Sequence, residues 1–151
     1  NIQDEKYLKK RLVELNIFDK VTFLGKYTQK QAPKIYHLAD AYITFSYQDN
    51  CPTAVIEAMA SGLPILYSAS GGIPELVNEG SGIGLKVKKS WQSIHIPKSN
   101  EIVEGMLKII NNKISMSESA RIRALEKFDI SYWLSRHHEI FNSLLEKKNL
   151  K

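Results

Sequence analysis

The chain has 151 residues, the length of one ordinary domain. Hydrophobic residues make up 43% and charged residues 25%, a composition that excludes an intrinsically disordered protein, and no apolar run reaches the roughly 20 residues of a membrane helix. The single cysteine excludes an internal disulfide framework and a Cys-rich zinc site, and it favours a cytoplasmic location. The net charge of +5 is compatible with nucleic acid, an anionic membrane surface or a phosphorylated small molecule as a partner.

Hydrophobic periodicity predicts that helices and strands alternate along the chain. Four short runs are rich in β-branched and aromatic residues and have the pattern of buried strands. These predicted strands are residues 21–24, 41–45, 64–67 and 83–87. Segments with apolar residues at helical spacing precede, separate and follow them. The predicted helices are residues 4–16, 28–38, 52–61, 74–78, 100–110, 115–128 and 131–148.

The order of these elements predicts an α/β fold. Strands that are separated by helices form a parallel sheet, so we expect a Rossmann-like, doubly wound sheet with helices on both faces and a helical C-terminal tail. Residues 1–151 are expected to form a single domain. In such sheets ligands bind outside the carboxyl ends of the strands. We therefore expect the loops 25–27, 46–51 and 68–73 to lie along one common edge.

The loop 46–51 and the helix that Pro52 begins carry most of the functional information. The first N–H groups of a helix and the positive end of its dipole attract anions. Glu57 lies about 7.5 Å further along the helix axis at 1.5 Å per residue, and Asp49 lies just before the helix. A nucleotide-diphosphate-sugar fits this arrangement, since each carboxylate can accept two hydrogen bonds from a vicinal diol. A structural role fits the same residues, because Glu favours the first half of a helix and Asp favours turns.

Three further features are open to a functional and a structural interpretation. Gly71 and Gly72 allow either a close backbone approach to a ligand or a turn with positive φ. Cys51 has the position of a thiol nucleophile at a helix start, but no histidine pairs with it in a known motif, so a packing or backbone role is favoured. The four histidines lack metal-ligand spacing, so we expect no metal and no cofactor.

Five motifs follow one another along the chain at characteristic separations. They are Val21-Thr22-Phe23-Leu24-Gly25, Tyr36-His37-Leu38-Ala39-Asp40-Ala41, the run from Asp49 to Ile56, Glu57-Ala58-Met59-Ala60-Ser61-Gly62-Leu63-Pro64, and Gly71-Gly72-Ile73-Pro74-Glu75-Leu76-Val77. Together they resemble the C-terminal lobe of the retaining glycosyltransferases of family 4, which have the two-lobed GT-B fold. The resemblance covers residues 1–87 well.

The resemblance implies a donor site for a nucleotide-diphosphate-sugar. The family has two glutamates separated by seven residues, and here Asp49 takes the place of the first and Glu57 is the second. By resemblance these are the catalytic pair, with Asp49 on the hydroxyls of the transferred sugar and Glu57 on the ribose. The shorter carboxylate of Asp49 would alter the preference for the sugar. The other donor-binding residues that the resemblance implies are Gly25, Lys26 and Tyr27 on the base, and Asn50, Cys51, Pro52, Thr53, Ala54, Val55, Gly71 and Gly72 on the sugar and diphosphate.

Two parts of the family's enzymes have no match in this sequence. One is the first βαβ unit of the lobe, whose Arg and Lys clamp the diphosphate, and the other is the N-terminal lobe, which binds the acceptor. We therefore expect a fragment of a hexosyltransferase of polysaccharide or lipopolysaccharide biosynthesis that is inactive alone. Its partners would be the nucleotide-sugar donor, a glycan or lipid-linked acceptor and the missing N-terminal lobe, without nucleic acid.

Two other functions fit the sequence. The first is a GT-B-like module that binds a nucleotide or sugar without transferring it, and the second is a basic interaction domain on an α/β scaffold. The basic side of the helix at 4–16 would suit a peripheral contact with the inner face of a membrane. A solvated helix face explains the same lysines.

Overall fold

The computed structural model describes residues 2–149, with side chains for residues 4–146, and the chain forms two compact units, Asn1–Ala32 and Pro33–Lys151. The first unit contains helix α1 (Ile2–Glu14) and one turn of 3-10 helix, η1 (Phe18–Lys20). Along α1, Lys9 forms an ion pair with Glu5 at 2.7 Å, one turn away, which supports the helix at its surface. The Lys9 ammonium also lies 5.1 Å from the centroid of the Phe23 ring.

The strand predicted at 21–24 is wrong. These residues form no strand, and Leu24 is 55% exposed. A strand is stable only when its N–H and C=O groups pair with a neighbouring backbone. Among the described residues, none pairs with this segment as a strand. Its composition suits a buried strand, but composition alone cannot form one.

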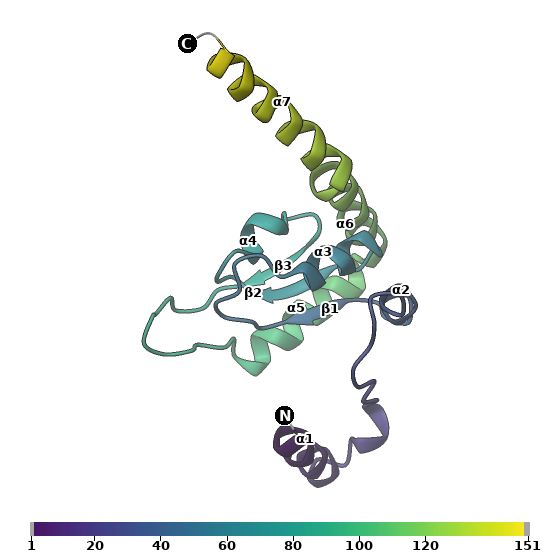
Figure 1. The fold of residues 1–151 in the computed structure, drawn as a ribbon. Coiled ribbons are helices and arrows are strands. Elements are labelled where there is room, and N and C mark those ends of the chain that lie inside the picture. Colours follow the sequence, from purple (N-terminus) through teal and green to yellow (C-terminus); the bar gives the residue numbers. More distant parts are fainter. Residues whose placement is uncertain (1, 150–151) are drawn as a thin grey trace. The chain divides into compact units, whose positions relative to one another are not determined.

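The second unit is built on a parallel three-stranded sheet (Figure 1). The strands are β1 (Tyr42–Thr44), β2 (Ile65–Ser68) and β3 (Gly82–Leu85), and they lie side by side in chain order. The register aligns Ile43 with Leu66 and Leu66 with Ile83. Helix α2 (Ala32–Tyr36) precedes β1, α3 (Thr53–Ala60) joins β1 to β2, and α4 (Ile73–Leu76) joins β2 to β3. The α/β fold and three of the predicted strands are thereby confirmed.

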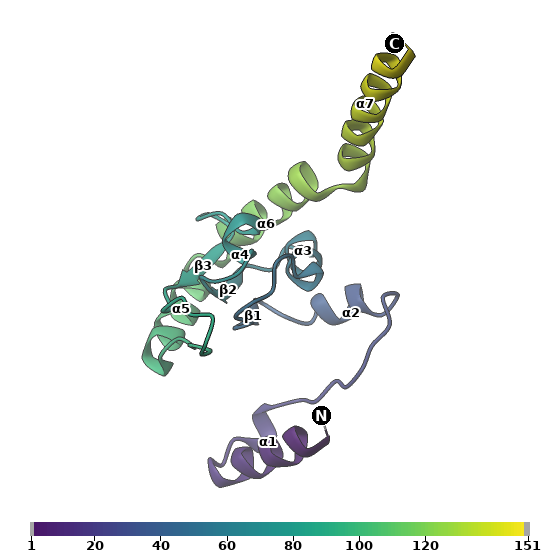
Figure 2. The ribbon, with the colours of Figure 1, turned by 60° about the vertical axis from the view of Figure 1, so that its left-hand side comes forward.

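Helices cover both faces of the sheet (Figure 2). Leu66 faces α5 (Ser99–Asn111), where Gly105 lets the helix approach so closely that a Cβ there would lie 2.6 Å from Leu66 Cδ1. The next residue, Tyr67, points to the opposite face, on which Arg123 of α6 (Lys113–Phe128) influences its ionisation. Helix α3 packs along α6. The core therefore lies in two layers around β2, whose residues are all buried.

The largest fully buried apolar side chains come from the sheet and from the helices next to it. They are Met59, Ile65, Leu66, Ile73, Ile109 and Val55. This core fixes β2, and β1 pairs with β2 in register, so the loops that follow the two strands lie at the same end of the sheet.

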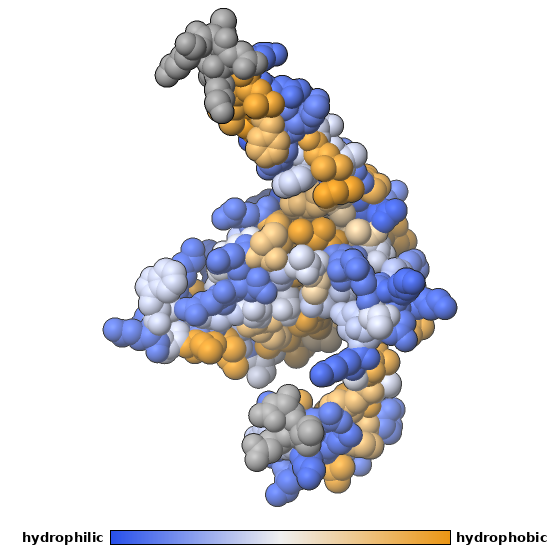
Figure 3. All heavy atoms as spheres, in the orientation of Figure 1, coloured by the Kyte–Doolittle hydropathy of each residue, from blue (hydrophilic) through white to orange (hydrophobic). Residues whose placement is uncertain are grey.

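The last helix, α7 (Ile130–Asn149), matches the predicted helical tail. Its rings contact one another along the helix, with Trp133 stacked on His137 at 3.7 Å between centroids and His137 edge-on to Phe141 at 6.0 Å. Leu134 and Leu144 are exposed, and Figure 3 shows orange apolar residues along α7. None of the described helices is both long and apolar enough to cross a bilayer.

Candidate functional site

The loop between β1 and α3, residues 46–51, forms the centre of the candidate site, and we call it the donor loop. It closes with an Asx turn in which the Cys51 N–H donates to Asp49 Oδ1 at 3.2 Å. Pro52 then occupies the N-cap position of α3, with φ −67° and ψ 106°, so the helix begins at Thr53, one residue later than the sequence predicted. The turn and the proline together hold Asp49 immediately before the helix.

The turn at Gly71 and Gly72 packs directly against the donor loop. The Gly72 N–H donates to the carbonyl oxygen of Asp49 at 2.9 Å. A Cβ on Gly72 would lie 1.7 Å from the carbonyl oxygen of Asn50, and one on Gly71 would lie 2.5 Å from that of Asp49. Gly71 also has φ +59°, a conformation that favours glycine. Both glycines are thus needed for the close approach of this turn to the backbone of the donor loop. Their contact with a donor stays a prediction.

The first turn of α3 contains the predicted anion-binding amides. Two of the residues implied by the resemblance use their N–H groups within the protein, Cys51 on Asp49 and Val55 on the Pro52 carbonyl at 3.0 Å. Pro52 has no N–H group. The amides of Thr53 and Ala54 head the helix, where no preceding turn offers an acceptor. They are therefore the best-placed donors to a phosphate group at α3.

The side chains of α3 separate into a core face and a polar face. Val55 and Met59 are fully buried, whereas Glu57 is half-buried and Thr53 is exposed. Ser61 follows on the polar side, but its hydroxyl is used within the protein, where it donates to the Glu57 carbonyl oxygen at 2.9 Å. Glu57 is therefore the side chain of α3 that combines charge, partial burial and a place one turn beyond the helix start.

Tyr36 holds the Glu57 carboxylate in place. Its phenol hydroxyl donates to Glu57 Oε2 at 3.1 Å, and the Tyr36 side chain is only 5% exposed. The Tyr36 ring packs edge-on against Tyr42 of β1 at 6.1 Å between centroids. Sequence reasoning missed this contact, and the one available signal was that a buried tyrosine hydroxyl usually needs a hydrogen-bond partner.

Two serine hydroxyls at the carboxyl end of β2 are buried without a hydrogen-bond partner. They belong to Ser68, at the end of the strand, and Ser70, directly before the Gly71–Gly72 turn. Buried hydroxyls are nearly always hydrogen-bonded in folded proteins, so such groups at a sheet edge point to a ligand or a bound water. Both serines lie in the predicted edge loop 68–73, but no sequence motif marks either of them as a site residue.

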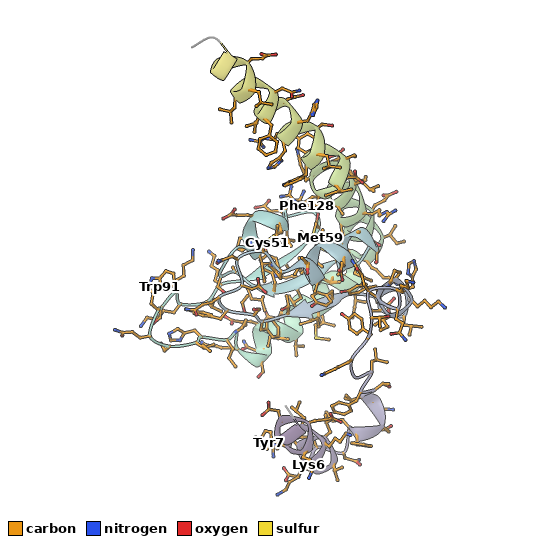
Figure 4. All side chains as sticks on the ribbon, viewed as in Figure 1. Lys6, Tyr7, Cys51, Met59, Trp91 and Phe128 are labelled. Carbon is orange, nitrogen blue, oxygen red and sulfur yellow. The ribbon has the colours of Figure 1, made fainter. Side chains whose placement is uncertain are left out.

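The structure places the predicted site residues in both compact units. Gly25, Lys26 and Tyr27 lie in the first unit, and residues 49–55, Glu57, Gly71 and Gly72 lie in the second. Within the second unit the donor loop, the α3 start and the glycine turn are in contact with one another. Cys51 is exposed (Figure 4). In the described part of the chain, no group of three or more His, Cys, Asp or Glu side chains could hold a metal ion.

The arrangement of a helix start, a carboxylate one turn along it and a loop at the carboxyl end of a parallel strand suits a nucleotide ligand. The family model of the glycosyl transferases group 1 matches residues 1–124. The chain belongs to this family. Among curated relatives, the N-acetyl-alpha-D-glucosaminyl L-malate synthase of Bacillus anthracis is 28% identical over 143 residues, which cover 91% of this chain and 34% of that protein.

Two solved structures show the same fold as the chain. Sucrose-phosphate synthase from Thermosynechococcus elongatus has a TM-score of 0.77 at 21% identity, over 96% of this chain and 35% of that one. HepE of Anabaena in complex with UDP-glucose has a TM-score of 0.76 at 23% identity, over 93% of this chain and 37% of that one. The likeness shows the shared fold, and the family model shows the glycosyltransferase family. The chain spans about a third of the length of each of these three proteins.

Proposed function

We propose that this group 1 glycosyltransferase chain is the donor-binding lobe of a retaining, family 4 hexosyltransferase. The complete enzyme would transfer a sugar from a nucleotide-diphosphate-sugar to a glycan or lipid-linked acceptor in the cytoplasm, with a peripheral place at the inner face of the membrane. The observation that carries the proposal is the part-buried hydrogen bond from Tyr36 that fixes Glu57 one turn beyond the α3 start. Supporting it is the family membership over residues 1–124.

In this proposal the ribose and the diphosphate lie along α3. Glu57 accepts hydrogen bonds from the two ribose hydroxyls, as a carboxylate does with a vicinal diol. The diphosphate takes the amides of Thr53 and Ala54 and the positive end of the helix dipole. These dipoles are fixed before the reaction, so they stabilise the charge that grows on the departing diphosphate without reorganisation. Neither a metal ion nor a cofactor takes part.

Asp49 would bind hydroxyls of the transferred sugar. Its Oδ1 already accepts the Cys51 N–H, so the turn orients the carboxylate and leaves the second oxygen for the ligand. Asn50 is adjacent to it in the donor loop. Gly25, Lys26 and Tyr27 would contact the base of the nucleotide.

Nucleotide titration tests this proposal. We expect UDP, GDP or ADP to bind in isothermal titration calorimetry, and Glu57→Gln to weaken that binding about 10- to 100-fold, the range for hydrogen bonds to a charged group. Glu126→Gln, which alters an exposed carboxylate on α6, is the matched control and should bind normally. Absence of binding to all three nucleotides, or equal binding by the Glu57→Gln variant, would contradict the proposed donor site.

Transfer activity separates an enzyme lobe from a binding module. The 151-residue chain should show little or no transfer of sugar from a nucleotide-sugar to an acceptor, and joining it to an N-terminal lobe should restore turnover. In that two-lobed protein Glu57→Gln should abolish most of the transfer. Turnover at a normal enzymatic rate by the chain alone would show that transfer does not need an N-terminal lobe, which would contradict the proposal.

A further inference from the structure

A cavity of about 450 Å³ lies next to the donor loop. Its walls come from the donor loop (Gln48, Asn50), from the turn after β2 (Ser70, Gly71) and from the loop between β3 and α5 (Lys89, Trp91). It shares only Asn50 and Gly71 with the predicted donor-binding residues, and no residue of α3 lines it. The cavity therefore adjoins the proposed nucleotide site without including the start of α3.

The outer wall of this cavity is hydrogen-bonded to the donor loop. The Tyr47 hydroxyl donates to the Lys88 carbonyl oxygen at 2.6 Å and accepts the Ser90 N–H, also at 2.6 Å. The Tyr47 ring is buried and packs edge-on against His95 at 6.3 Å between centroids. Tyr47 thus links both ends of the 88–95 segment to the donor loop, and this holds the segment beside the cavity.

Trp91 stands on this anchored wall with its ring uncovered. It is 95% exposed, and Figure 4 shows it at the tip of the loop between β3 and α5. An aromatic ring in the wall of a cavity offers a ligand a large apolar contact area, so Trp91 is a candidate contact. The indole ring offers a flat apolar surface on which the C–H face of a pyranose can stack.

The remaining lining groups suit the hydroxyls of a sugar. Ser70 is only 3% exposed and its hydroxyl has no hydrogen-bond partner. The amides of Gln48 and Asn50 can donate and accept hydrogen bonds. Lys89 carries the only formal charge among the lining residues, so the cavity suits a neutral or acidic sugar better than a cationic one.

From this combination we infer that the cavity binds a pyranose unit of the acceptor, stacked on Trp91 and hydrogen-bonded by Ser70 and the neighbouring amides. The inference rests on the proposed function, since it gives the donor lobe a contact with the acceptor in addition to the acceptor site expected on the N-terminal lobe. It places the acceptor sugar beside the donor loop, with Asn50 and Gly71 as the shared wall between the two substrates.

Tryptophan fluorescence offers a direct test. The chain has two tryptophans, so Trp133→Phe leaves Trp91 as the single reporter. We expect saturable changes of Trp91 fluorescence when methyl α-glucoside, methyl α-galactoside, methyl α-mannoside and methyl α-glucuronide are titrated in turn, with at least one of them binding. That binding should persist in the presence of saturating UDP-glucose, because the donor occupies a different space.

Two variants connect the signal to the cavity. By saturation-transfer NMR, Trp91→Ala should weaken glycoside binding about 3- to 10-fold, the range for a lost aromatic contact. Ser70→Ala should weaken it by a similar factor, whereas Ser143→Ala, an exposed serine on α7, should not. Neither Trp91→Ala nor Ser143→Ala should change the affinity for UDP.

The outcomes separate this inference from the proposed function. If UDP binds in a Glu57-dependent manner and no glycoside changes Trp91 fluorescence, the donor site stands and the acceptor site is refuted. If glycosides compete with UDP-glucose, or only UDP-glucose affects Trp91, the cavity belongs to the donor and the inference is overturned. Glycoside binding without any nucleotide binding would support the cavity and refute the proposed donor site.

Discussion

The Tyr36 hydroxyl donates a hydrogen bond to Glu57 Oε2 over 3.1 Å, between two residues that are 21 positions apart in the chain. The bond connects α2, which precedes β1, with α3, which follows it. Glu57 is half-buried, and a partner of this kind restricts a carboxylate that would otherwise sample several rotamers. The orientation of Glu57, the proposed ribose-binding carboxylate, is therefore set by a residue of another helix.

Tyr36→Phe should weaken nucleotide binding by about 3- to 10-fold, since it removes one neutral hydrogen-bond donor and keeps the buried ring. The thermal midpoint should change little, because the ring still packs against Tyr42. Calorimetric titration with UDP measures the first effect and differential scanning calorimetry the second. Tyr132→Phe, which alters an exposed tyrosine on α7, is the control. Equal UDP affinity of Tyr36→Phe and wild type would show that Glu57 needs no external support.

Gly72→Ala should disrupt the donor loop. The new Cβ would lie 1.7 Å from the Asn50 carbonyl oxygen, and a backbone atom cannot rotate away as a side chain can. Overpacking of this kind costs about 1–3 kcal/mol, so urea denaturation should show a clear loss of stability, accompanied by weaker UDP binding. In Gly80→Ala the new Cβ meets only the side chain of Ser119, so that variant should stay close to wild type. Similar losses in both variants would count against a specific clash at the loop.

Arg123→Lys should loosen the end of α4. The Arg123 guanidinium donates to two of the last carbonyl oxygens of this helix, that of Leu76 through Nε and that of Glu75 at 2.8 Å. A lysine cannot reproduce this two-pronged contact, so we expect a loss of about 1 kcal/mol in the free energy of unfolding, measured in urea. Arg136→Lys on α7 changes an exposed arginine and should have no measurable effect. A loss of equal size at both positions would show that the contact with α4 is not the cause.

Tyr67→Phe should reduce the sensitivity of the protein to alkaline pH. Burial raises the pKa of Tyr67 above its usual value of 10.0, and the nearby Arg123 opposes part of this rise. The folded state therefore holds this proton more tightly than the unfolded state. Its contribution to stability is complete below about pH 10 and is lost as the pH rises through the raised pKa.

Urea denaturation at about pH 8 and pH 11 measures this difference. Wild type should lose more stability between the two values than Tyr67→Phe does. Tyr132→Phe, in which an exposed tyrosine is replaced, should lose as much as wild type. If the Tyr67 variant is equally sensitive to alkali, another group must account for the alkaline loss.

Local patterns predicted most of the second unit because its elements are short, well bounded and packed on one core. The apolar run at 64–67 became a strand buried on both faces, and Gly62 ends the preceding helix with φ +78°. The segment 21–24 has an equally good strand composition and is not a strand. The difference lies in pairing, which depends on residues distant in sequence and is invisible in a window of four residues.

The candidate site was predictable in part for the same reason. Asp49, Glu57 and the glycine turn are short motifs, and the positions of the sheet-edge loops follow from the strand order. Tyr36 acts across 21 residues, and Ser70 matters because it is buried without a partner. Neither property has a sequence signature. The sequence also could not show that Gly72 is required by the Asn50 carbonyl and not by a ligand.

Cys51 makes the donor loop a single site for thiol-specific labelling. It is the single thiol of the chain, it is exposed, and its own N–H closes the turn on Asp49. A maleimide-linked fluorophore would therefore attach at one defined place, two residues from the proposed sugar-binding carboxylate. Events in the loop could then be followed in real time, one molecule at a time, without removal of any competing cysteine.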